Sequence, residues 1–338
     1  MCTNFKCKQA KDGTVVVGRT EEFPLEMPWN LGVLPVGYQG EGVAPKGSKA
    51  KGKQWTSTYG VIGMSCFGKP NWYADAMNEA GVSAHVLYMD YADFCVYQDF
   101  KGDGSDLSEL DVVAFLLGTC ASLKEVRAAA ADINVWGHDP GMGLIPPVHI
   151  IMHDKDESIA IEFHPEGHRI VDNPLGVATN APYLDWHYIN AGNYLGMSSM
   201  DPSSIAVPGK KDIQALGQGQ GLVALPGSPT SPSRFIRALA MVTASDQPAD
   251  GHEAEQLTLH ILNNFDITPG LVREPAGSKI VDQVTDYSSV SNLTDLRYAV
   301  RTFGDPTTYV IDVAQTDFTG EPRTAPLPTQ GHFHPVTV

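Results

Sequence analysis

Alternating hydrophobic and polar positions near the start of the chain predict two β-strands joined by a tight turn. The strands cover residues 3–7 and 14–19, and Asp12-Gly13 between them is a dipeptide typical of hairpins. Because hairpin strands pair antiparallel, the start of the first strand lies close to the end of the second. The same kind of pattern predicts further strands at 59–64, 81–88, 148–153, 158–163, 168–171, 175–179, 296–303 and 308–313.

Helical patterns occur in two pairs, at 110–120 with 122–131 and at 234–244 with 254–264. Ser122 and Glu125 form a capping box at the start of the second of these helices. The order of elements is strand-rich, helix pair, strand-rich, helix pair, strand-rich. Two helical layers around two packed sheets would bury the apolar faces of both sheets, so we predict an α+β fold of four αββα layers. We expect a single domain over residues 1–338, since no repeat and no long linker divides the chain.

Composition excludes some partner classes. The chain has 338 residues, 42% of them hydrophobic, which is enough for a large core. Its formal net charge is −16 without a run of Lys or Arg, so binding to nucleic acid or to an anionic membrane surface is not expected. No apolar segment reaches the roughly 20 residues that span a bilayer. Because the negative net charge repels an anionic substrate, binding one would require an arginine in the binding site.

The cysteines are few and scattered, which argues against a disulfide framework or a Cys-x-x-Cys zinc site; they are Cys2, Cys7, Cys66, Cys95 and Cys120. We expect no metal and no cofactor, and we do not assign a metal to His332 and His334 near the end of the chain. No signal-like segment precedes Cys2, so the cytoplasm is the expected compartment. A removed signal peptide replaced by Met would instead indicate the periplasm.

Cys2 directly follows Met1, and aminopeptidases remove Met before small residues. Cys2 would then carry both a thiol nucleophile and an α-amine with an ordinary pKa of roughly 7.7–8, which can accept the thiol proton near neutral pH. The predicted hairpin places Arg19 and Glu22 near this residue. A nearby arginine favours the thiolate form of a cysteine.

Several segments, in this order along the chain, resemble the choloylglycine hydrolase and penicillin V acylase family of N-terminal-nucleophile hydrolases. They are Met1-Cys2-Thr3, Gly18-Arg19-Thr20-Glu21-Glu22, the segments 75–81, 179–187, 225–227 and 233–235, and Tyr287-Ser288-Ser289-Val290. The resemblance covers nearly the whole chain. It implies the αββα sandwich of N-terminal-nucleophile hydrolases, in agreement with the layers predicted above.

The resemblance also implies roles for residues around the nucleophile. Cys2 matches the nucleophile and Arg19 the arginine beside it. Glu22 stands where the family has Asp, so the carboxylate that would hold the α-amine is one methylene longer. Glu21 is a neighbouring candidate, but strand alternation is expected to place it on the opposite face, and we prefer Glu22 on spacing.

Four more positions match the family in the oxyanion and nucleophile region. Asn180 matches the side-chain donor to the oxyanion, and Tyr88 the residue whose backbone N–H is the second donor. Arg234 matches an arginine near the nucleophile, although an arginine in the first turn of a helix also forms surface salt bridges. We interpret His187 as a packing and loop-anchoring residue.

Met64, Phe67 and Trp136 are expected in loops that match the pocket walls of the family and would bind an apolar acyl group. The implied activity is hydrolysis of a linear amide through a thioester on Cys2. Tyr88 favours phenoxymethylpenicillin-like amides, followed by N-acyl homoserine lactones and then conjugated bile salts. Residues 208–221 replace a region that some relatives use to form tetramers, so a homodimer or homotetramer stays open.

Two rival interpretations assign the chain to other classes of protein. The chain could be an inactive protein of this fold, with Glu22 as the damaging change. It could also be a relative of ceramidase-like amidases that expose an internal cysteine by self-cleavage, although the position of Cys2 argues against this. Loss of Met1 alone supports the hydrolase, and two fragments support self-cleavage.

Overall fold

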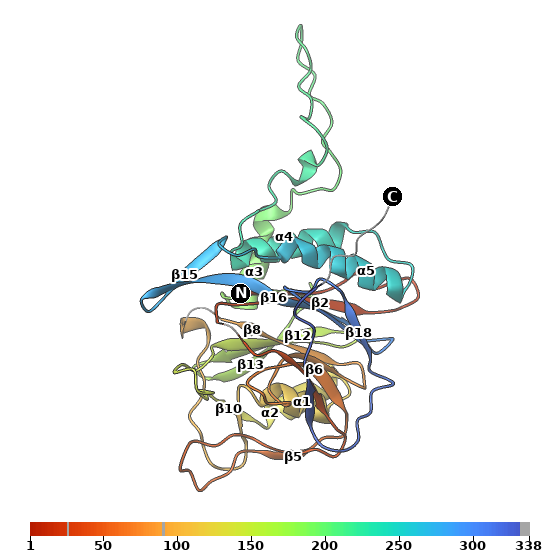
Figure 1. Ribbon diagram of the computed structural model, residues 1–338. Coiled ribbons are helices and arrows are strands. Elements are labelled where there is room, and N and C mark those ends of the chain that lie inside the picture. Colours follow the sequence, from red (N-terminus) through yellow and green to blue (C-terminus); the bar gives the residue numbers. More distant parts are fainter. Residues whose placement is uncertain (26, 90–91, 332–338) are drawn as a thin grey trace.

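The computed structural model describes residues 1–331 apart from 26 and 90–91. The described residues form two large antiparallel sheets that stack face to face, with helices on both outer faces (Figure 1). The predicted αββα layers are therefore confirmed. No helix among the described residues is long and apolar enough to cross a membrane.

The first sheet has seven strands in the order β14-β1-β2-β16-β17-β18, with β15 paired to β16. Its strands are β1 Cys2–Lys6, β2 Val16–Phe23, β14 Val177–Ala178, β15 Val272–Ala276, β16 Lys279–Asn292, β17 Arg297–Thr302 and β18 Tyr309–Asp312. The predicted hairpin is present: β1 pairs antiparallel with β2, and Gly13 in the turn has φ +94°, which favours glycine.

The second sheet has eight strands in the order β13-β12-β11-β8-β7-β6-β3-β19. They are β3 Asn30–Leu34, β6 Val61–Ser65, β7 Tyr73–Asn78, β8 Ser83–Tyr88, β11 Val148–His153, β12 Ser158–His164, β13 Gly167–Asp172 and β19 Arg323–Ala325. Two small two-stranded sheets lie outside it, formed by β4 Gln39–Glu41 with β5 Gln54–Thr56 and by β9 Asp106–Ser108 with β10 Asn134–Trp136.

The helices cover the outer faces in the predicted pairs. Helices α4 Ser231–Ala244 and α5 Gly251–Leu262 pack on the first sheet, and α1 Val112–Thr119 and α2 Leu123–Ala131 pack on the second (Figure 1). Ser122 caps α2 by accepting a hydrogen bond from the Glu125 N–H, as the capping box predicts. A further short helix, α3 Leu184–Ala191, covers the Asp185-Trp186-His187 segment, for which the sequence indicated no helix.

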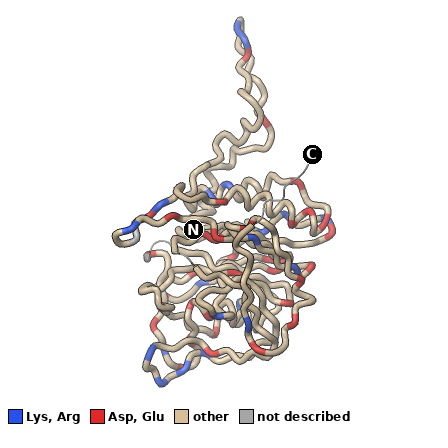
Figure 2. The backbone as a smooth tube through the Cα atoms, viewed as in Figure 1, with Lys and Arg blue, Asp and Glu red and all other residues tan. Residues whose placement is uncertain are grey.

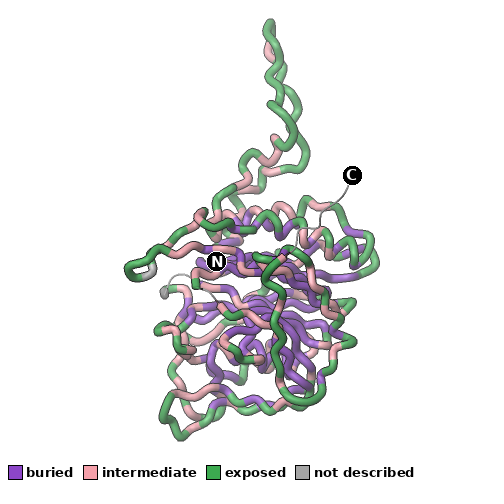
Figure 3. Tube along the Cα trace, in the orientation of Figure 1, coloured by how far each residue is buried: buried purple, intermediate pink, exposed green. Residues whose placement is uncertain are grey.

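The polypeptide between α3 and α4 contains an arm, which we define as residues 199–220, that projects away from the layered body (Figure 1). Its residues are almost all exposed, whereas the buried residues concentrate between the sheets and under the helices (Figure 3). Charged residues occur along the whole trace, including the layered body (Figure 2). Some of them, Arg19 and Arg234 among them, are fully buried and are therefore candidates for function.

Candidate functional site

The hairpin of β1 and β2 brings the predicted nucleophile and its arginine together. Cys2 pairs with Glu21 across the hairpin, and Arg19 lies two residues before Glu21 on the same face of β2. The Arg19 Nη2 atom lies 3.7 Å from the Cys2 Sγ atom. Both residues are buried, with 1% and 0% of their surface exposed. A cation held this close to a buried sulfur stabilises the thiolate.

Arg19 is fixed by acceptors on several elements. It forms an ion pair with Glu21, lies 3.4 Å from an Asp75 carboxylate oxygen, donates to the Val86 carbonyl at 2.7 Å and donates to the Tyr287 hydroxyl. Burial acts to lower the pKa of Arg19, but the surrounding Tyr287, Cys2 and Asp75 raise it above its usual value. The guanidinium group is therefore charged throughout the working pH range.

Asp75 is a buried member of this network to which the sequence alone assigned no role. Its carboxylate accepts hydrogen bonds from Ser289 at 2.5 Å and from the Tyr298 hydroxyl. Burial raises its pKa, and Arg19 counteracts this shift. The sequence did contain a signal, because Asp75 and Ser289 both lie in segments that resemble the family.

Glu21 and Glu22 lie on opposite faces of β2, as strand alternation predicts. Both Glu21 carboxylate oxygens lie 3.9 Å from the Cys2 Sγ atom, so Glu21 shares the face of the thiol. Glu21 lies on the same face as Arg19, because residues 19 and 21 are two apart and strand side chains alternate with a period of two. It is Glu22 that points to the other face.

Glu22 lies on the side of the sheet that faces α4 and α5. Its Oε1 atom accepts a hydrogen bond from the Thr285 hydroxyl at 2.9 Å, and its Oε2 atom has no hydrogen-bond partner among the described residues. Burial raises the pKa of Glu22, while the N-terminal ammonium group and Arg234 act to lower it. The Met1 ammonium group donates to the Glu22 carbonyl at 2.5 Å. Glu22 is thus adjacent to the N-terminus, with a free acceptor atom.

Asn180 and Arg234 converge on the backbone of Cys2. The Cys2 N–H donates to the Asn180 Oδ1 atom at 2.9 Å, and Arg234 donates to the Cys2 carbonyl and to the same Asn180 oxygen. Arg234 also donates to the Thr3 hydroxyl at 2.9 Å and is 1% exposed. The surface salt bridge considered for Arg234 is therefore not what the structure shows.

The start of α4 positions both groups. Arg234 lies in its first turn, and Ser231 at its first residue accepts a hydrogen bond from the Asn180 N–H at 3.0 Å. Asn180 also donates through Nδ2 to the Tyr88 carbonyl at 2.6 Å, so these two residues are adjacent, as the resemblance implied. His187 anchors the same segment, since one ring nitrogen lies 3.0 Å from the Asn180 carbonyl.

The three candidate pocket residues do not form one group: Met64 lies in the core, apart from Phe67 and Trp136. Met64 lies in β6 and is fully buried in a core cluster, and Trp136 lies in β10, so the expectation that they lie in loops is wrong for both. Phe67 follows β6 in a turn with φ +56°. Phe67 and Trp136 are linked by ring contacts through Trp72 and His138. Their contact with a substrate stays a prediction.

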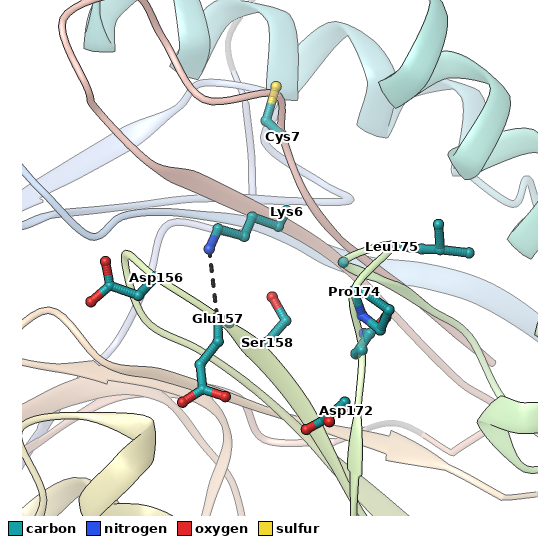
Figure 4. Close-up of a pocket in the computed structure, with 10 residues that line it drawn as sticks. Lys6, Cys7, Asp156, Glu157, Ser158, Asp172, Pro174 and Leu175 are labelled. Carbon is teal, nitrogen blue, oxygen red and sulfur yellow. Dashed lines mark hydrogen bonds between the residues drawn. The ribbon is translucent and has the colours of Figure 1, made fainter.

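A surface cavity of about 570 Å³ lies at the other end of β1 and is distinct from this cluster (Figure 4). In it the Lys6 ammonium group donates to the carbonyl oxygens of Asp154 at 2.9 Å and Glu157 at 3.5 Å. Its lining residues include neither Cys2 nor Arg19. Lys6 is engaged by the β11–β12 turn, so we interpret this cavity as structural.

Two sheets between helical layers, with a buried cysteine at the second residue, are the features of an N-terminal-nucleophile hydrolase. The fold matches the crystal structure of a cysteine-to-alanine mutant of conjugated bile acid hydrolase from Clostridium perfringens, with a TM-score of 0.85 and 26% identity over 100% of both chains. It also matches penicillin V acylase from Agrobacterium tumefaciens, with a TM-score of 0.76 and 22% identity over 96% of this chain and 90% of the other.

Sequence comparison gives the family. The model of linear amide C–N hydrolases, choloylglycine hydrolase family, matches residues 2–323, and the chain belongs to this family. The bile salt hydrolase/transferase of Clostridium perfringens (strain 13 / Type A) is 30% identical over 95% of this chain and 94% of its own. The bile salt hydrolase/transferase of Lactiplantibacillus plantarum (strain ATCC BAA-793 / NCIMB 8826 / WCFS1) is 30% identical over 72% of this chain and 74% of its own. The chain is a hydrolase of amide bonds, as the resemblance implied.

Proposed function

We propose that this chain is a cysteine-dependent amidohydrolase in which Cys2, freed by removal of Met1, is the nucleophile. The observation that carries the proposal is the convergence of Arg19 on the Cys2 sulfur, at 3.7 Å, with that of Asn180 and Arg234 on the Cys2 backbone. These contacts come from β2, the β14–α3 connection and α4, so three distant segments meet at one residue.

The reaction uses the groups of the chain and water. The α-amine of Cys2 accepts the thiol proton, and the thiolate attacks the acyl carbonyl. The C–N bond breaks, the leaving amine takes the proton, and the acyl group stays on sulfur as a thioester. Water then attacks the thioester, its proton passes to the α-amine, and the carboxylic acid leaves as the thiol is restored.

The oxyanion is assigned to the Asn180 amide and the Tyr88 backbone N–H. The hydrogen bond from Asn180 Nδ2 to the Tyr88 carbonyl supports this assignment, because it shows that the two residues are in contact. Each such donor contributes about 3 kcal/mol to transition-state stabilisation in comparable enzymes. The free Oε2 atom of Glu22 is the group we assign to holding the α-amine once Met1 is removed.

Two observations support different acyl groups. The bile salt hydrolases among the relatives named above support a steroid acyl group. The Tyr88 side chain, whose ring centroid lies 5.6 Å from that of Phe23, supports a phenoxymethylpenicillin-type acyl group. N-acyl homoserine lactones are the third class. A single domain and a homodimer or homotetramer are part of the same proposal.

The test is a turnover panel of penicillin V, an acyl homoserine lactone and glycocholate, run on protein whose intact mass shows the loss of Met1. Cys2→Ala is expected to abolish turnover, and the matched control Cys7→Ala, another buried cysteine, is expected to retain it. Turnover that survives Cys2→Ala refutes the proposal. Glu22→Asp tests the alternative that the protein is inactive because Glu22 replaces the family Asp. A large gain in turnover in this variant would support that alternative.

A further inference from the structure

A second carboxylate shares the space in front of the nucleophile. Glu21 lies opposite Cys2 in the β1–β2 register, and both of its oxygens are 3.9 Å from the Cys2 sulfur. Glu21 is only 6% exposed, and its ion pair with Arg19 fixes its position. The sequence segment that carries it resembles the family through Arg19, but no role follows from that resemblance for position 21.

The charges on this face leave little to attract an anion. Arg19 is the cation beside the sulfur, and it lies between two carboxylates, those of Glu21 and Asp75. Arg234 lies on the other side of the strand, where it is engaged by the Cys2 carbonyl and Asn180. A substrate that approaches the sulfur therefore meets a carboxylate at 3.9 Å from the sulfur as well as the cation at 3.7 Å.

Attack places the scissile carbonyl carbon about 3–3.5 Å from the sulfur, so the groups attached to that carbon come into contact range of Glu21. A carboxylate on such a group would face a like charge in a buried site, which is strongly unfavourable. We infer that Glu21 is a specificity-determining residue that favours amides whose groups next to the scissile carbonyl are uncharged or cationic, and disfavours anionic ones. This inference rests on Cys2 being the nucleophile of the proposed function.

The experiment measures the charge preference at Cys2 directly. Trimmed protein is alkylated with neutral iodoacetamide and, separately, with anionic iodoacetate, and modification of Cys2 is followed by peptide mass spectrometry. The ratio of the two rates cancels any change in the thiolate fraction, because both reagents attack the same sulfur. Glu21→Gln keeps the shape of the side chain and is expected to lower the neutral-to-anionic ratio by about tenfold or more.

Two further variants make the result specific. Glu166→Gln, on the exposed β12–β13 turn, changes the net charge equally and is expected to leave the ratio unchanged. Glu21→Asp keeps the charge but withdraws it by one methylene, and an intermediate ratio is expected. If Glu21→Gln does not fold, as judged by circular dichroism, Glu21→Asp carries the test by itself.

The outcomes separate this inference from the proposed function. An unchanged ratio in Glu21→Gln, or no modification of Cys2 by either reagent, overturns the inference. A shifted ratio in a protein that turns over no amide supports the role of Glu21 and counts against the proposed function. With an active protein, Glu21→Gln is also expected to raise kcat/KM for glycocholate relative to an acyl homoserine lactone.

Discussion

Asp75→Asn is the change that tests most directly how the site is held together. Asp75 is buried 3.4 Å from Arg19 Nη1, and neither side chain is exposed. At an effective dielectric constant of 20, this distance corresponds to a Coulomb attraction of about 5 kcal/mol, before the desolvation of both charges is subtracted. Breaking a buried ion pair by removing one partner costs about 3–5 kcal/mol.

The lower end of this range applies here, because Arg19 keeps Glu21 as a second carboxylate. We therefore expect the free energy of unfolding to fall by about 3 kcal/mol in Asp75→Asn. Tyr298→Phe, which removes one hydroxyl donor to the same carboxylate, is expected to cost about 1.5–3 kcal/mol, the range for hydrogen bonds to charged groups.

Urea unfolding followed by circular dichroism measures both values, provided that the denaturant dependence keeps the wild-type slope. Asp246→Asn, an exposed position between α4 and α5, is the matched control and is expected to leave stability unchanged. A loss below about 1 kcal/mol in Asp75→Asn would refute the reasoning, since it would mean that Arg19 does not depend on its buried counterion.

Three further predictions concern other parts of the molecule. Arg234→Lys is expected to lower kcat by about a hundredfold or more in steady-state assays of amide hydrolysis, because Lys lacks the fork that bridges the Cys2 carbonyl and Asn180. Burial raises the pKa of Glu109 from 4.5 to about 8, so the unfolded state loses this proton first and the free energy of unfolding falls as pH rises across that interval, by about 1.4 kcal/mol per pH unit. Glu109→Gln is expected to remove this slope. If the free energies of unfolding of the two proteins follow parallel curves against pH, the prediction is wrong. Replacing residues 199–220 by a short Gly-Ser turn is expected to change the stability measured by thermal unfolding by no more than about 1 kcal/mol, because the Ser198–Gly221 hydrogen bond of 2.9 Å already closes the base of the arm.

The hairpin at the N-terminus was predictable because its information is local. Alternation in both strands and the Asp12-Gly13 turn identify the hairpin. The register is not local information: a two-residue turn at Asp12-Gly13 would pair Asn4 with Glu21, whereas Asn4 pairs with Arg19. The helix pairs were predictable for the same reason, since the apolar periodicity of a helix and its capping residues lie within a few turns of one another.

Strand β16 was not predicted, although at 14 residues it is the longest in the structure and lies between β2 and β17. Its inner half contains Ser288, Ser289 and Ser291, which are buried but polar. Their environment comes from strands far away in sequence, as in the hydrogen bond from Ser289 to Asp75. A polar residue that is satisfied only by a distant partner has no local hydrophobic signature.

The placement of Glu21 and Glu22 shows how the alternation of a single strand can assign chemistry. Adjacent residues point to opposite faces, so one carboxylate meets the thiol of Cys2 and the other lies near the N-terminus. In the proposed mechanism a cation favours the thiolate, and Arg19 is the cation on the Glu21 face. In the same mechanism the α-amine is held by Glu22 on the other face, whose Oε2 atom has no hydrogen-bond partner among the described residues. Neutralising Glu21 should therefore change which electrophiles reach the sulfur, whereas neutralising Glu22 should change how well the amine takes the proton, and the two effects can be measured independently.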